Sequence, residues 1–225
     1  MQTTPRNGTV NWLWVILLVV IANLVQLPVA FLSRGSGGAR IGWAVVYVLG
    51  FVVAVAIAAW RYRKVWPHYQ YRRLRGADWR LMIGAYVFII VVEEVLNLLN
   101  FYVFHQTTTA NNQAILDLVQ RSPLTLVMMS LTAICASPFL EELTFRGLLM
   151  DGCLPEMGFW LPIVVSAVAF SLVHMSTTPA SWLLYAMMGG SFAYVYRRTG
   201  KIQATIIMHA FNNLLAMGTL WLLLK

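Results

Sequence analysis

The stretch PLTLVMMSLTAICASPFLEELTFRGLL, residues 123–149, is apolar almost throughout and yet contains Glu141, Glu142 and Arg146. It is long enough to cross a bilayer as an α-helix, which requires about 20 predominantly apolar residues. Removing an ionised carboxylate from water costs several kcal/mol unless a partner compensates its charge. The stretch therefore predicts a membrane helix whose charged cluster has a structural or chemical role.

Apolar runs of this kind recur along the 225 residues, of which 60% are hydrophobic and 11% are charged. Soluble domains have roughly 25% charged residues, so the composition excludes that class. We predict an all-α fold, a polytopic transmembrane helical bundle of about seven spans, with six to eight compatible with the pattern. The expected spans are 11–33, 41–61, 81–104, 123–149, 158–178, 181–197 and 202–224.

The net charge of +8 is concentrated in short loops between these spans. The loop 61–80 alone contains seven Arg or Lys residues, and the segment YRRTGK at 196–201 contains three. Because such loops remain on the cytoplasmic side, both are expected to be cytoplasmic, together with the N-terminus. The polar loop 105–122 is then expected on the outer side. This distribution sets topology, and no nucleic-acid partner is predicted.

The charged residues of the spans lie mainly in the C-terminal half, which divides the chain into two regions. Residues 1–122 form an N-terminal membrane region of three spans with the basic loop 61–80, and residues 123–225 form a C-terminal core region. In the first region, VVEEVLNLLN carries Glu93 and Glu94, which we interpret as lining a cavity or joining helices. Asn97 and Asn100 fall on roughly the same helical face as Glu93 and are expected to solvate it.

Within the charged cluster, Glu142 and Arg146 are four residues apart, which places their side chains on one helical face as an ion pair. Glu141 is rotated by about 100° and must find another partner. A carboxylate that faces a hydrated cavity can accept a proton from water. The alternative is a purely structural salt-bridge cluster, and the stretch by itself favours neither interpretation.

Two later spans also carry polar side chains at helical spacing. FSLVH places Phe170 and His174 on one face, and HAFNN does the same for His209 and Asn213, with Asn212 turned aside. A histidine and an amide on one face can donate two hydrogen bonds to one point, which is what an oxyanion hole requires. A lone histidine in an apolar helix is otherwise usually a packing residue.

These three segments resemble the motifs of one family, the CPBP family (CAAX proteases and bacteriocin-processing, or Abi, proteins) of intramembrane proteases. EELTFRG is similar to its EExxxR motif, FSLVH to FxxxH and HAFNN to HxxxN, in the same order. The run with Tyr196, Thr199, Gly200 and Ile202 is similar to the family's YxxTGxI pattern. The resemblance covers roughly residues 123–217 and leaves out the first three spans.

The resemblance implies an intramembrane endopeptidase in which Glu141 is the general base for water and His174 assists it. It further implies that His209 and Asn213 stabilise the oxyanion. Glu142, Arg146 and Phe170 are then supporting residues. The substrate class would be CAAX-type peptides or peptides of bacteriocin maturation and self-immunity. A non-catalytic membrane immunity or toxin-binding protein is the alternative. A proton-coupled transporter is disfavoured, since the sequence shows no inverted repeat.

The resemblance leaves the cofactor open, because members of the family are commonly described as metalloproteases. Glu141, His174 and His209 would be the ligands if Zn²⁺ were bound. We prefer a metal-free mechanism, because there is no HExxH and no Asp or Glu obviously placed to orient either histidine. The expected partners are a peptide substrate and the lipid bilayer. The expected location is a bacterial cell membrane. The sequence predicts no oligomeric state.

Overall fold

The computed structural model describes residues 8–67 and 71–224, and every regular element among them is helical. In chain order the elements are α1 (Gly8–Leu24), the 3₁₀-helix η1 (Leu27–Phe31), α2 (Gly37–Val65), α3 (Gly76–Phe104), α4 (Ala110–Val119), α5 (Pro123–Cys135), α6 (Ser137–Glu142), the π-helix η2 (Leu143–Cys153), α7 (Trp160–Leu172), α8 (Pro179–Thr199) and α9 (Ile202–Leu223). The predicted all-α fold is confirmed.

Each of the seven predicted spans coincides with a helical stretch of the described residues. Four of these stretches are long and apolar enough to cross a membrane: Gly8–Phe31, Gly37–Val65, Gly76–Phe104 and Pro123–Cys153. α7 is a shorter apolar helix, and α8 and α9 correspond to the last two predicted spans. The chain is a helical membrane bundle.

One predicted loop, 105–122, is wrong in part because it contains the helix α4. The hydroxyl of Thr109 caps this helix by accepting a hydrogen bond from the backbone N–H of Asn112. The same hydroxyl lies 2.8 Å from the hydroxyl of Tyr185 on α8. A ten-residue helix is marginal alone, so its cap and this tertiary contact explain why a polar segment becomes helical.

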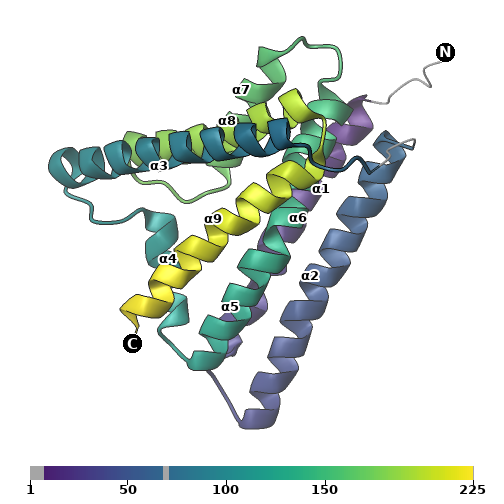
Figure 1. Ribbon diagram of the computed structural model, residues 1–225. Coiled ribbons are helices and arrows are strands. Elements are labelled where there is room, and N and C mark those ends of the chain that lie inside the picture. The colour runs from purple at the N-terminus through teal and green to yellow at the C-terminus, as the bar shows by residue number, and fades with distance from the viewer. Residues whose placement is uncertain (1–7, 68–70, 225) are drawn as a thin grey trace.

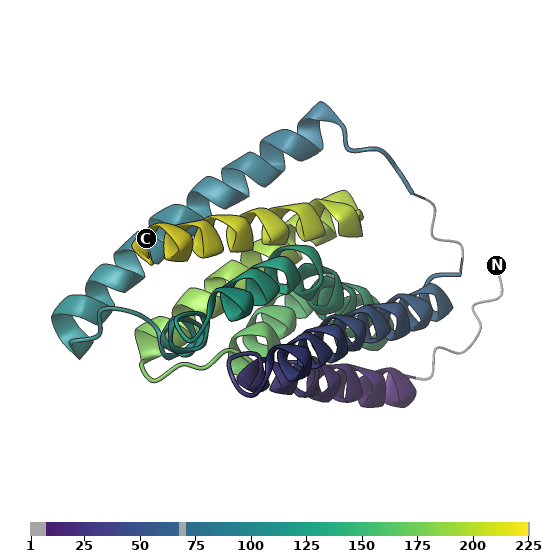
Figure 2. The same cartoon turned by 90° about the horizontal axis from the view of Figure 1, so that it is seen from below.

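The helices form two groups that cross. α8 packs against both α3 and α7, whereas α1, α2, α5 and α9 run together in a different direction (Figure 1). The view from below shows α9 between α3 and the other helices of the second group (Figure 2). The helical stretch α6–η2 packs against both α1 and α2, so the segment with the glutamates lies inside the bundle.

The two loops predicted to be cytoplasmic are neighbours in the fold. The ammonium of Lys201 donates to the backbone carbonyl of Arg73 at 3.1 Å and forms an ion pair with Asp78 at 2.5 Å. The amide of Gln203 donates to the carbonyl of Arg72 at 2.7 Å. The described part of the basic loop 61–80 therefore contacts the start of α9. Positions 68–70 of this loop lie outside the described residues. The cytoplasmic assignment itself remains a prediction, and residues 1–7 also lie outside the described residues.

The helical stretch with the charged cluster is irregular, and its irregularity positions the glutamates. Helix α5 ends at Cys135, and Ala136 leaves the helical region with φ −122° and ψ −49°. α6 then begins with Ser137 and Pro138, and η2 continues it as a π-helix whose residues 143–152 are all buried. Such wide turns are frequent at functional sites.

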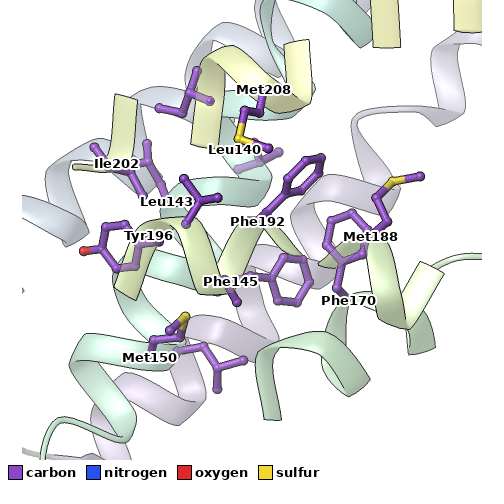
Figure 3. Packing of buried hydrophobic residues seen from close by; sticks show 14 of the residues in the cluster. Leu140, Leu143, Phe145, Met150, Phe170, Met188, Phe192, Tyr196, Ile202 and Met208 are labelled. Atoms are coloured by element: carbon purple, nitrogen blue, oxygen red, sulfur yellow. The ribbon is translucent and has the colours of Figure 1, made fainter. Parts of the chain in front are cut away.

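Apolar packing around this stretch comes from α7, α8 and α9. Phe145 and Phe170 meet edge to face with ring centroids 5.7 Å apart, and Phe192 closes the group (Figure 3). Gly189 of α8 lies against Phe170 so closely that an added Cβ would be 2.8 Å from the phenylalanine Cβ. Close helix contact at small residues is typical of membrane bundles, and here it sets the position of Phe170.

Candidate active site

The described residues form an open cavity of about 490 Å³ that is lined by side chains from both helix groups. Four of its lining residues are the predicted catalytic set, Glu141, His174, His209 and Asn213. They come from α6, from the turn after α7, and from α9. The structure therefore brings together in one cavity the residues that the sequence places on three separate segments.

The ion pair expected between Glu142 and Arg146 is present, with Oε1 3.0 Å from Nη1 and both side chains 0% exposed. Arg146 Nη2 also donates to the backbone carbonyl of Gly189 at 2.8 Å. Its guanidinium lies over the rings of Phe170 and Phe192, 4.9 and 5.5 Å from their centroids. These contacts anchor the charged cluster to α7 and α8 and compensate a buried cation.

Glu142 has a second partner that the sequence does not reveal. Its Oε1 lies 2.9 Å from Nδ1 of His209 on α9. A carboxylate oxygen only accepts, so Nδ1 carries the proton and the ring orientation is set by Glu142. The sequence shows no Asp or Glu obviously placed to orient either histidine, but in the fold Glu142 orients His209. The carboxylate comes from a different helix, which sequence spacing does not show.

Glu141 is held differently from Glu142. Its Oε1 accepts a hydrogen bond of 2.6 Å from the hydroxyl of Ser137, one helical turn earlier. Its Oε2 is buried and has no hydrogen-bond partner among the described residues. Nε2 of His209 lies 3.8 Å from Oε2, which exceeds a direct hydrogen bond.

His174 lies just beyond the end of α7, which stops at Leu172. Its Nδ1 lies 2.7 Å from the carbonyl of Phe170, so Nδ1 donates and Nε2 is left for other partners. The imidazole is sandwiched between Phe170 and Tyr185, with centroid distances of 4.5 and 4.6 Å. Because α7 is short and α8 returns beside it, His174 reaches the same cavity as Glu141.

The predicted pairing of His209 and Asn213 on one point stays a prediction, since each side chain also has a partner within the fold. His209 Nδ1 faces Glu142, whereas Asn213 Nδ2 donates to the carbonyl of Ala133 on α5 at 2.8 Å. An amide nitrogen has two N–H groups, so one of them remains for a ligand. Asn212, expected to be turned aside, also lines the cavity and accepts a hydrogen bond of 3.4 Å from Tyr86.

Glu93 and Glu94 line the same cavity from α3, as expected for a cavity-lining cluster. Asn97 is also on the lining, but Asn100 is not beside Glu93. Asn100 is buried and bound to hydroxyls of α8 and of the loop before it, those of Ser181 and Thr178, at 3.1 and 2.6 Å. Positions 93 and 100 fall on nearly the same face of α3, but α8 packs against that face near Asn100 and provides its hydrogen-bond partners.

The two histidines of the cavity meet one requirement of a zinc site but not another. Both histidines have the kind of partner on Nδ1, a carboxylate or a backbone carbonyl, that orients zinc ligands. However, no three His, Cys, Asp or Glu side chains in residues 8–67 and 71–224 are grouped closely enough to hold a metal ion. The arrangement does not fit a zinc site, and no step below passes through a metal.

Two residues of the site were missed from the sequence. Ser137 is four positions before Glu141, so the same spacing rule that finds the Glu142–Arg146 pair was available to find it. Tyr185 carries no such signal, because it meets His174 only through the packing of α8 against the loop after α7.

Comparison with known proteins agrees with the motifs. Residues 123–215 match the family model described as type II CAAX prenyl endopeptidase Rce1-like. The chain is 26% identical over 214 residues, 89% of its own length and 85% of the relative's, to "Putative membrane peptidase YdiL" of Bacillus subtilis (strain 168). No solved structure matches the chain significantly. Both matches support a protein similar to the CPBP family of intramembrane proteases, with the Rce1-like match at residues 123–215.

Proposed function

We propose that the chain is an intramembrane endopeptidase in which the carboxylate of Glu141 activates a water molecule. The observation that carries this proposal is the state of Glu141 Oε2, buried at the cavity without a hydrogen-bond partner and 3.8 Å from His209 Nε2. A buried carboxylate oxygen without a donor is costly, which is expected of an atom that has to accept a proton during turnover.

In the proposed reaction, Glu141 Oε2 takes one proton from water while the water oxygen attacks the scissile carbonyl carbon. The tetrahedral intermediate collapses as the carbon–nitrogen bond breaks, and Glu141 returns the proton to the leaving nitrogen. The products are a carboxyl group and an amine. A positioned general base contributes typically about 10²–10⁴-fold to the rate of such a step.

The oxyanion of the intermediate requires donors close to Glu141. Nε2 of His209 is turned toward Glu141, and the Glu142 carboxylate on Nδ1 stabilises positive charge on that ring. The second N–H of the Asn213 amide is the other donor in this proposal. Each oxyanion donor is typically worth about 10²–10³-fold in kcat. His174, held by Phe170 and Tyr185, assists Glu141 from the cavity wall.

The proposed substrate is a peptide, in line with the description of the matching family, and two classes remain to be separated. One is a prenylated CAAX-type terminus and the other an unprenylated peptide of the kind processed in bacteriocin production. The test uses the full chain in proteoliposomes with a fluorescence-quenched peptide ending in farnesylated Cys-Val-Ile-Met, and with the same peptide lacking the farnesyl group. Wild type is expected to cleave at least one of them, and Glu141→Gln neither.

Controls separate loss of chemistry from loss of folding. Glu141→Gln keeps the shape of the side chain and the acceptor for Ser137, so its thermal unfolding is expected to resemble that of wild type. A folded wild-type protein that cleaves neither peptide, nor a labelled casein, contradicts the proposal. Such a result would favour the alternative of a binding protein without turnover.

A further inference from the structure

Ser137 stands at the one break in the helical stretch that carries the glutamates. Ala136, just before it, has non-helical φ and ψ of −122° and −49°, and Ser137 is the first residue of α6. The N-cap of α6 is Ala136, whose methyl group cannot accept a hydrogen bond, so Ser137 occupies the first helical position rather than the capping one. The hydroxyl of Ser137 is instead donated to Glu141 Oε1 at 2.6 Å.

The direction of this contact follows from helix geometry. Long side chains lean back toward the helix N-terminus, so Glu141 covers the turn that contains position 137. The result is a short, charge-assisted hydrogen bond of the stronger class. It occupies Oε1 and leaves Oε2 as the oxygen without a partner.

Without that bond, a second arrangement is available to Glu141. His209 Nε2 is 3.8 Å from Oε2, and rotation of the carboxylate about its terminal torsion would bring the two atoms to hydrogen-bond distance. A direct hydrogen bond would engage both groups with each other and occupy the oxygen that accepts the proton of water in the proposed reaction. His209 cannot turn away in compensation, because Glu142 holds its Nδ1.

We infer that Ser137 is a positioning residue that keeps Glu141 Oε2 apart from His209 and so available as the acceptor for a proton from water. This inference rests on the proposed function and goes further by assigning a role to a residue outside the three motifs. Ser137 does not touch the substrate in this inference. Replacing Ser137 is therefore expected to change kcat, through the position of Glu141, rather than KM.

The test uses two variants that differ only in a hydroxyl against a methyl group, Ser137→Thr and Ser137→Val. Ser137→Thr keeps a donor and is expected to retain kcat within about threefold. Ser137→Val is expected to lose about 10–100-fold in kcat with KM within about twofold, because small misplacements of a base cost rate rather than binding. Ser191→Ala, which removes a hydroxyl bound to the Met187 carbonyl away from the cavity lining, is the control with unchanged kcat.

Equal kcat in the threonine and valine variants overturns the inference, as does a loss that appears mainly in KM. Infrared difference spectra provide a readout that needs no turnover. The carboxylate band of Glu141, isolated by subtracting the spectrum of Glu141→Gln, is expected to be the same in wild type and Ser137→Thr and shifted in Ser137→Val. Should wild type cleave no peptide, the proposed function fails, while identical bands in the two variants still overturn the inference about Ser137.

Discussion

The carboxylate of Glu142 binds the imidazole of His209 across 67 positions of sequence, with Oε1 2.9 Å from Nδ1. The same oxygen is 3.0 Å from Arg146 Nη1, so one carboxylate connects a buried cation to a ring that lines the cavity. The two adjacent glutamates therefore have different roles in the fold. Oε2 of each has no hydrogen-bond partner among the described residues, but Glu142 is fully buried and paired through Oε1, whereas Glu141 lies on the cavity lining.

Replacing Glu142 by leucine is expected to destabilise the protein more than any change at Glu141. Arg146 would keep its charge at 0% exposure without its carboxylate, and breaking a buried pair costs about 3–5 kcal/mol. Thermal unfolding in detergent measures the effect. The double variant Glu142→Leu/Arg146→Met removes both charges and is expected to recover part of the loss. Wild-type stability in Glu142→Leu would refute this account of the pair.

Gly189→Ala is expected to reduce both stability and kcat. The new Cβ would lie 2.8–2.9 Å from Cβ, Cδ1 and Cγ of Phe170, the residue whose carbonyl and ring hold His174. Forcing extra volume into a packed interior costs typically about 1–3 kcal/mol. Gly84→Ala is the matched control on α3, since nothing lies within 4 Å of its added Cβ. Similar behaviour of the two variants in unfolding and turnover assays would argue against this packing constraint.

The two neighbouring asparagines of α9 are expected to differ in turnover. Asn213→Ala removes the proposed oxyanion donor and the bond to the Ala133 carbonyl, so kcat is expected to fall about 10²–10³-fold. Asn212→Ala loses a long 3.4 Å contact with Tyr86 and is expected to change kcat less than tenfold. Steady-state kinetics on the cleaved peptide decides the matter. A larger loss at Asn212 would reassign the donor.

Metal removal is expected to leave activity intact, because the described His, Cys, Asp and Glu side chains offer no group of three for a metal ion. The measurement is peptide cleavage after dialysis against EDTA and 1,10-phenanthroline, with elemental analysis of the purified protein. Zinc bound in stoichiometric amount and lost in both His174→Ala and His209→Ala would overturn the metal-free mechanism. It would also require the cavity to close around the ion.

Local spacing accounted for those parts of the site that lie within one helix. The Glu142–Arg146 pair followed from a separation of four residues, and the same rule contains the Ser137–Glu141 contact. Spacing failed where the partner belongs to another helix. The bond from His209 to Glu142 and the stacking of Tyr185 on His174 depend on how α6, α8 and α9 pack.

Composition and periodicity were sufficient for the all-α membrane fold, because a lipid environment requires each spanning segment to satisfy its own backbone hydrogen bonds. Ordered motifs were sufficient to indicate the family resemblance and to select Glu141, His174, His209 and Asn213, which all line the cavity. Only the tertiary structure decided which oxygen of Glu141 is free, which carboxylate orients His209, and that the Asn213 amide is tied to α5. The reason is physical: hydrogen bonds between helices depend on side-chain directions in space, and these are set by packing rather than by position along the chain.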